Sequence, residues 1–190
     1  MSYTPSIAFV CASLREGSIN RRLESALMER AQARGARVER VDLGEYEMPL
    51  YHGDLDTPDT VPALIARLKT FDAVVIVSPE YNGSLPPLLK NVIDWTSTVE
   101  TGHLTGPDYG VASCTPGPMS GIMCMRQLAY ILNRLGADVV PTQVGCGLAA
   151  QAFDAQGKLI AEPASSLADK MLGQLMERAR RRACVSDEEE

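Results

Sequence analysis

The fold is decided by an apolar run, IAFVCA at residues 7–12, which leads directly into a polar loop, SLREGSIN at residues 13–20. Six apolar residues are too few for a buried helix, and they suit a strand that is covered on both faces. Asn20 can cap the helix that follows, and Gly35 can end it. A strand, a loop and a helix in this order predict the first unit of an alternating α/β chain.

The same alternation continues along the chain. Further strands are expected at residues 38–43, 73–77, 109–113 and 138–144, the last of them interrupted by Pro141. Amphipathic helices are expected around residues 20–35, 62–68, 86–95, 128–136 and 167–176. Five strands alternating with helices predict an α/β fold, a doubly wound three-layer sandwich with a five-stranded parallel sheet. Because ligands of such sheets bind beyond the carboxyl ends of the strands, we expect the site in the loops after the first, third and fourth strands.

Length and composition indicate one globular domain. The chain has 190 residues, of which 45% are apolar and 22% charged. We expect a single domain over residues 1–185 and a flexible acidic tail over residues 186–190. No apolar run approaches the roughly 18 residues of a membrane span. The first five residues carry no basic segment of the kind that begins a targeting signal, so we expect a cytoplasmic protein with no membrane partner. A net charge of -6 argues against a nucleic-acid partner.

Neither the cysteines nor the histidines form a recognisable metal or disulfide pattern. The five cysteines are far apart and odd in number, and each is predicted to be a small apolar side chain, buried or half-buried: Cys11, Cys114, Cys124, Cys146 and Cys184. His52 and His103 have no second ligand nearby in the sequence, so no metal is expected. Either histidine could lie near a substrate, but no partner residue is visible for either one, and no catalytic residue is assigned.

The loop at residues 13–20, the first loop, has the chemistry of an anion site. It ends at a helix N-terminus, where free N–H groups and the helix dipole favour a phosphate. Ser13, Ser18 and Asn20 can donate hydrogen bonds, and Arg15 can add a charge-assisted one. Neither the dinucleotide fingerprint nor the ATP-type glycine-rich loop is present. Taken alone, this loop could also be a capped polar turn.

The loop at residues 78–87, the second loop, reads SPEYNGSLPP and suits a flat heterocycle. Tyr81 offers a ring, Asn82 offers a donor and an acceptor, and Gly83 lets the backbone approach a ligand closely. Taken alone, it could be a structural loop whose tyrosine packs on the surface.

Together the two loops resemble those of the NAD(P)H-dependent FMN reductase family. The resemblance rests on SLR at 13–15 with Ser18 and Asn20, and on SPEYN at 78–82 followed by LKNVIDW at 89–95. It covers roughly residues 6–150 and implies a flavodoxin-like fold that binds FMN. It also implies that the FMN phosphate is held by Ser13, Arg15, Ser18 and Asn20. The ring would then be lined by Pro79, Glu80, Tyr81, Asn82 and Ser84.

A third loop, SCTPGPMSGIM at residues 113–123, departs from the family pattern. Family members tend to carry a glycine pair followed two positions later by an arginine. This chain keeps Gly117 and Gly121 but has Ser120 and Met123 instead. From this loop the resemblance implies Ser113 and Gly117 as further FMN contacts.

The resemblance implies an oxidoreductase in which NADPH or NADH reduces bound FMN. The electrons then pass to a small acceptor such as a quinone, an azo compound, a metal oxyanion or free flavin. The flavin supplies the reactive chemistry, which needs no nucleophile from the protein. The alternatives are a flavodoxin-type electron carrier, a supplier of reduced flavin to a monooxygenase, and a flavin-binding regulator without turnover.

We also expect a homodimer or a homotetramer. The helix at residues 87–95 carries more large apolar side chains than one sheet face easily hides, and such a surface usually marks an interface. The choice between dimer and tetramer, the preferred nucleotide and the physiological acceptor are left open by the sequence.

Overall fold

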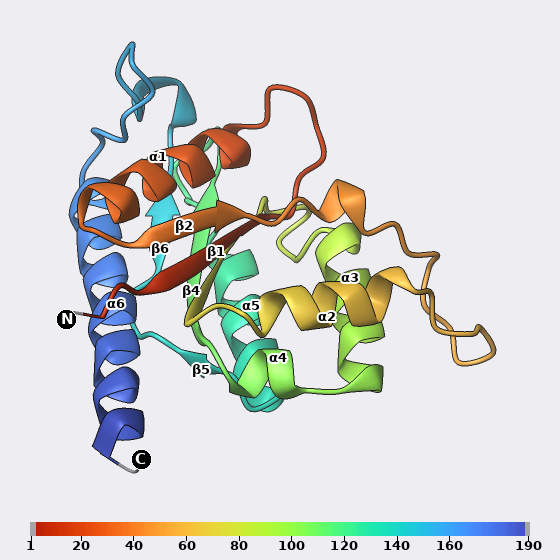
Figure 1. The fold of residues 1–190 in the computed structure, drawn as a ribbon. Helices are drawn as coiled ribbons and strands as arrows, with labels where there is room; N and C mark the ends of the chain where they lie inside the picture. The colour runs from red at the N-terminus through yellow and green to blue at the C-terminus, as the bar shows by residue number, and fades with distance from the viewer. Residues whose placement is uncertain (1–2, 189–190) are drawn as a thin grey trace.

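One central sheet lies between two layers of helices in the computed structural model, which describes residues 3–188, with side chains as far as residue 185 (Figure 1). The strands are β1 (Ser6–Cys11), β2 (Arg37–Arg40), β3 (Ala73–Val77), β4 (Asp108–Cys114), β5 (Asp138–Val139) and β6 (Val144–Cys146). The α-helices are α1 (Ile19–Ala33), α2 (Thr60–Leu68), α3 (Pro87–Val99), α4 (Gly102–Thr105), α5 (Ile122–Arg134) and α6 (Ala164–Glu188). Two 3-10 helices, η1 (Leu43–Glu45) and η2 (Ala149–Gln151), complete the regular structure. No helix in the described chain is both long and apolar enough to cross a membrane.

The strand order confirms the predicted fold class. All pairs are parallel, and the order is β2-β1-β3-β4-β5, with β6 also paired to β4. This is the flavodoxin-like order. The direction of winding reverses between β1 and β3, so a crevice forms beyond the carboxyl ends of these two strands. The strand expected at residues 138–144 is divided into β5 and β6, with Pro141 in the gap where a backbone donor is missing.

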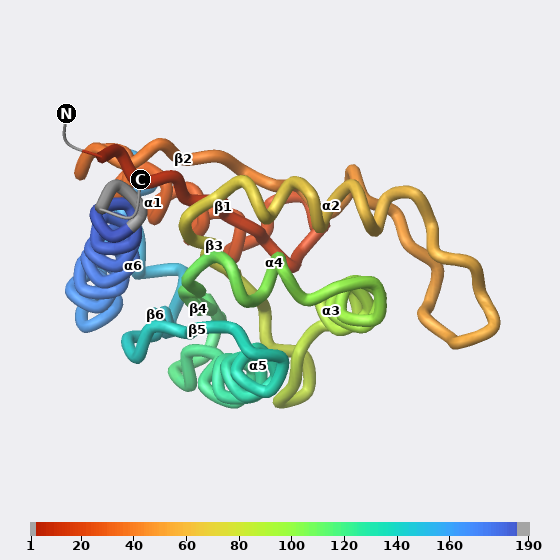
Figure 2. Tube along the Cα trace, turned by 60° about the horizontal axis from the view of Figure 1, so that its bottom comes forward, coloured from red at the N-terminus to blue at the C-terminus, as the bar shows by residue number. Residues whose placement is uncertain are grey.

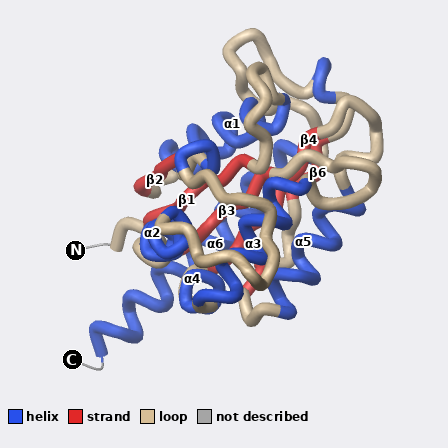
Figure 3. Tube along the Cα trace, turned by 90° about the vertical axis from the view of Figure 1, so that its right-hand side faces the viewer, coloured by secondary structure: helices blue, strands red, loops and turns tan. Residues whose placement is uncertain are grey.

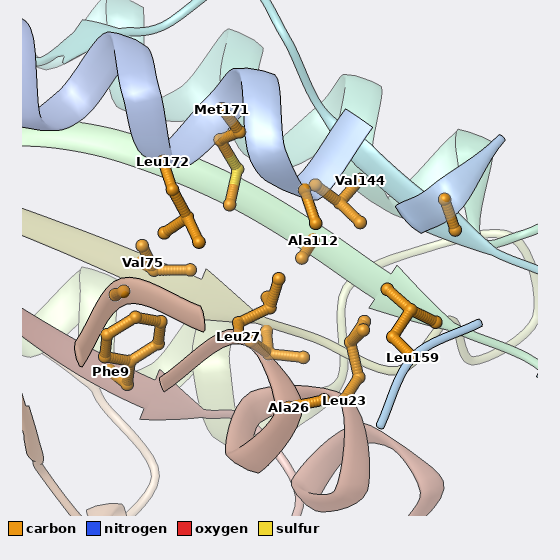
Figure 4. Close-up of a cluster of buried hydrophobic side chains, with 14 of the residues drawn as sticks. Phe9, Leu23, Ala26, Leu27, Val75, Ala112, Val144, Leu159, Met171 and Leu172 are labelled. Atoms are coloured by element: carbon orange, nitrogen blue, oxygen red, sulfur yellow. The ribbon is translucent and has the colours of Figure 1, made fainter. Parts of the chain in front are cut away.

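The sheet is buried on both faces because its strands alternate their side chains between two cores. Helices α1 and α6 cover one face, and α2, α3, α4 and α5 cover the other (Figure 2). Figure 4 shows Leu27 of α1 and Met171 and Leu172 of α6 gathered over Phe9 and Val75. Continuous apolar strands such as β3 are therefore a consequence of burial on both sides.

The ends of two helices differ from the sequence expectation. The N-cap of α1 is Ser18 and not Asn20, because the Ser18 Oγ accepts from the N–H groups of Asn20 (3.3 Å) and Arg21 (3.4 Å). Asn20 therefore lies inside the first helical turn. At the other end of the chain, α6 continues to Glu188, so residues 186–188 of the expected tail are helical. Residues 189 and 190 lie outside the described part of the chain.

Two burial expectations require correction. Cys184 is exposed, whereas the other four cysteines are buried as predicted. On α3, the large apolar side chains of Leu89, Ile93 and Trp95 are buried within the monomer. Trp95 also donates its indole N–H to the Pro49 carbonyl oxygen at 2.7 Å. The apolar face of α3 is therefore already covered, and it does not support the expected association between subunits.

Candidate cofactor site

The three predicted loops meet around a hollow of about 210 Å³ at the carboxyl edge of the sheet. Figure 3 shows the long loops gathered at this end of the molecule, beyond β4 and β6. The hollow lies where β1, β3 and β4 end, at the reversal of strand order. It is lined by Ser13, Arg15, Ser18, Ile19, Asn20, Pro79, Glu80, Tyr81, Cys114, Thr115 and Pro116.

The first loop presents a row of free backbone donors. Within the described chain, the N–H groups of residues 13–17 donate to no acceptor. Gly17 takes a left-handed conformation (φ +68°), which lets the loop turn into α1. Arg15 is exposed and forms no ion pair with any described residue. Free amides, a guanidinium and the N-terminus of a 15-residue helix form a donor set that fits a phosphate. The FMN phosphate therefore fits this loop.

Asn20 connects the first loop to the third. Its Nδ2 donates to the Cys114 carbonyl oxygen (3.0 Å), and its Oδ1 accepts from the Cys114 N–H (2.8 Å). The side chain is buried, so both bonds are shielded from water. One hydrogen of its Nδ2 and one lone pair of its Oδ1 are left for a ligand. Asn20 thus positions the end of β4 in addition to lining the hollow.

The second loop contains a tight turn that places Tyr81 at the rim. The N–H of Tyr81 donates to the Ser84 carbonyl oxygen and the N–H of Ser84 to that of Tyr81, both at 3.0 Å. Asn82 (φ +52°) and Gly83 (φ +75°) between them are left-handed, as a type I′ turn requires. Tyr81 is 48% exposed and offers one ring to a flat ligand.

Two side chains of the second loop bind α5. The Glu80 Oε2 accepts from the N–H groups of Met123 (2.9 Å) and Cys124 (3.0 Å). The Ser84 Oγ lies 2.8 Å from the Gln127 Oε1 and donates to it. Glu80 still lines the hollow, whereas Ser84 points to α5 and lies outside the lining.

Ser113 and Gly117, expected as FMN contacts in the third loop, also lie outside the lining, as does Asn82. Ser113 is fully buried, and a Cβ atom on Gly121 would lie only 1.9 Å from its Oγ. Ser113 therefore packs behind the third loop. The Gly117 carbonyl oxygen accepts from the Thr115 Oγ1 (3.0 Å) and the Leu148 N–H (3.1 Å). These two hydrogen bonds stabilise the conformation of the third loop.

The third loop shows why a glycine pair suits this position. Ser120 (φ +58°) and Gly121 (φ +71°) are both left-handed, and only glycine adopts that conformation without steric cost. Residues 114–116 line the hollow from this loop, and sequence reasoning missed them together with Ile19. Their position at the carboxyl end of β4 is the available signal, because residues 79 and 80 lie just beyond the carboxyl end of β3 in the same way.

Two of the titratable side chains that line the hollow are already engaged: the Glu80 carboxylate accepts from two N–H groups of α5, and the Cys114 thiol is buried. A hydrogen bond to Cys146 and burial both raise the pKa of Cys114, which keeps it a neutral thiol. His103 lies in α4, which precedes β4 and so lies at the opposite edge of the sheet. Burial lowers its pKa to about 4. His52 is exposed between η1 and α2, on a segment that projects from the body (Figure 1). Neither histidine reaches the hollow.

A larger hollow of about 530 Å³ lies beside η1 and α3, lined by Leu14, Leu43, Gly44, Tyr46, Glu47, Met48, Pro49, Leu88, Asn91 and Val92. Its lining is mostly apolar and holds no cation. The smaller hollow matches a phosphorylated ligand better, because it combines free amides with Arg15.

Comparisons with known proteins agree with this chemistry. The sequence model of the family described as NADPH-dependent FMN reductase matches residues 5–151. The quinone reductase of Escherichia coli is 35% identical over 144 residues, which are 74% of this chain and 76% of that protein. The quinone reductase of Pseudomonas putida is 34% identical over 166 residues, which are 84% and 87% of the two chains. The solved structure of FerB, an NAD(P)H:(acceptor) oxidoreductase from Paracoccus denitrificans, matches with a TM-score of 0.77 and 27% identity over 94% of this chain and 98% of FerB.

Proposed function

The chain belongs to the NADPH-dependent FMN reductase family and is an NAD(P)H-dependent oxidoreductase that uses FMN, and we propose that its acceptor is a quinone. The proposal of a quinone is supported by relatives at 34–35% identity that are named quinone reductases. The observation that carries the proposed cofactor site is the row of free N–H groups at residues 13–17 beside Arg15, opening into the same hollow as Tyr81.

The chain's own residues bind and orient the two reactants. Residues 13–17 with Arg15 and the Ser18 hydroxyl would hold the phosphate, and Pro79 and Tyr81 would line the ring. Bound FMN supplies the acceptor for hydride from the nicotinamide and the donor for the quinone. Because this chemistry belongs to the cofactor, turnover requires no catalytic acid or base from the lining residues.

The experiment is anaerobic reduction of the reconstituted protein. Addition of NADPH or NADH should abolish the visible absorbance of bound FMN within seconds, and a quinone should restore it. Free FMN with the same nucleotide is the control for uncatalysed reduction. Persistence of the absorbance with both nucleotides would refute the proposed activity and favour an electron carrier. Comparison of kcat/KM for a quinone, an azo dye, chromate and free FMN tests the acceptor, and a higher value for any of the others would refute the quinone proposal.

We also propose a homodimer and a cytoplasmic location. The dimer is supported by exposed apolar side chains near the hollow and along α5, namely Tyr81, Met123 and Tyr130, of which Tyr130 is 68% exposed. A cytoplasmic location fits a co-substrate that cells keep in that compartment. Light scattering should give twice the chain mass of 20.5 kDa. A mass equal to one chain at micromolar concentration would contradict the dimer.

A further inference from the structure

Glu80 caps a helix to which it does not belong. The first N–H groups of any α-helix have no partner within the helix. In α5 the N-cap residue is Gly121, which has no side chain to accept from them. The Glu80 Oε2 takes this place and accepts from the N–H groups of Met123 and Cys124, at 2.9 and 3.0 Å. One carboxylate of the second loop therefore satisfies the start of α5.

Further contacts join the same two segments. The Cys124 Sγ lies 3.3 Å from the Pro79 carbonyl oxygen and 3.4 Å from the Ser78 Oγ. The Ser84 hydroxyl donates to Gln127 one turn further along α5. The second loop is thus attached to α5 on both sides of Tyr81, with Glu80 as its charged contact. The position of Tyr81 at the rim of the hollow depends on this attachment.

The charge of Glu80 also acts on the hollow. Arg15 and Glu80 are the charged residues among those that line it. A helix N-terminus carries about half a positive charge, and the Glu80 carboxylate offsets that charge at α5. Reduced FMN carries more negative charge in its ring system than oxidised FMN. A nearby carboxylate therefore disfavours the reduced form, since charge near the ring tunes its electronics.

We propose that Glu80 is a positioning residue that fixes the second loop on α5 and, through its charge, makes the site bind oxidised FMN in preference to reduced FMN. In this way Glu80 makes the bound cofactor a stronger electron donor to its acceptor. This inference rests on the proposed FMN site and adds to it a residue that sets the balance between the two redox states.

The test distinguishes the effect of the hydrogen bonds that Glu80 accepts from the effect of its negative charge. Glu80→Gln keeps an oxygen that can accept from both N–H groups of α5 but removes the charge. The Kd for oxidised FMN should change by less than about twofold, because the neutral ring feels the charge only weakly. The Kd for reduced FMN, measured anaerobically, should fall on the order of tenfold. That ratio corresponds to a rise of about 30 mV in the two-electron reduction potential of bound FMN. Glu80→Ala removes the cap as well, so its melting temperature and its affinity for oxidised FMN should both fall.

Glu29→Gln is the matched control. Glu29 is exposed on α1 outside the lining of the hollow, so the substitution removes the same charge and should leave the reduction potential unchanged. An unchanged ratio of the two Kd values in Glu80→Gln, with wild-type binding of oxidised FMN, would overturn this inference alone. Failure of the wild-type protein to bind FMN at all would overturn the proposed site and this inference together.

Discussion

At the scale of single residues, we expect recognition of the FMN phosphate to depend most on Arg15. It is the cation in the lining of the hollow, and it adjoins the free N–H groups of residues 13–17. A helix N-terminus compensates a phosphate dianion only in part, so the guanidinium should add a strong bond. Arg15→Ala should weaken FMN binding by roughly ten- to a hundredfold, or about 1.5–3 kcal/mol. Fluorescence-quenching titrations measure this directly.

Riboflavin is the matched ligand, because it lacks the phosphate and should bind the wild type and Arg15→Ala about equally. Arg180→Ala is the matched variant: Arg180 is exposed on α6, outside the lining of the hollow, and its loss changes the net charge by the same amount. Equal losses for FMN and riboflavin in Arg15→Ala would show that Arg15 does not recognise the phosphate.

At the scale of elements, the packing of α6 on the sheet depends on one glycine. A Cβ atom on Gly110 of β4 would lie 3.0 Å from the Met171 Sδ and 3.1 Å from the Leu175 Cδ1, both on α6. Gly110→Ala must displace these side chains, so we expect a loss of about 1–2 kcal/mol in the free energy of unfolding. Urea denaturation gives the value.

Substitution of Gly173, which lies on α6, should have the opposite effect on the free energy of unfolding. A Cβ atom there would meet nothing within 4 Å. Gly173→Ala should raise the free energy of unfolding by about 0.5–1 kcal/mol, because alanine is the better helix former. A Gly110→Ala protein as stable as Gly173→Ala would contradict the close approach of α6 to β4.

At the scale of the whole molecule, both helical layers pack on one sheet, and we propose that residues 1–185 form a single domain that unfolds as a unit.

His103 should make the stability of this domain depend on pH. Burial lowers the pKa of His103 from 6.5 to about 4, with smaller and opposing effects of Glu100 and Lys69. Between these two values the unfolded chain binds the proton and the folded chain does not. Stability therefore falls as pH falls through this window.

Replacement of His103 by leucine should remove this dependence. The His103 Nδ1 is buried without a partner among the described residues, so His103→Leu loses no hydrogen bond at that atom. Between pH 7 and pH 5 the wild type should lose about 2 kcal/mol more than the variant in its free energy of unfolding. Urea titrations at several pH values test this, with His52→Leu, on the exposed segment, as control. Identical slopes for the wild type and His103→Leu would contradict it.

The sequence by itself determined the alternation of strands and helices, the flavodoxin-like fold and the loops of the proposed site. These properties depend on short stretches of sequence. Residues 73–77 form a continuous apolar run, and the first loop contains its own hydrogen-bond donors. Sequence also indicated the break at Pro141, because proline lacks the backbone donor that a strand needs.

Only the tertiary structure decided which partner each polar side chain of these loops contacts. Asn20 bonds to Cys114, 94 positions away, and Glu80 bonds to Cys124, 44 positions away. Ser113 has the same hydroxyl as Ser13, yet it packs behind Gly121 and not toward the hollow. The partner of a polar side chain is set by which distant segment packs beside it, and no local pattern of residues contains that information.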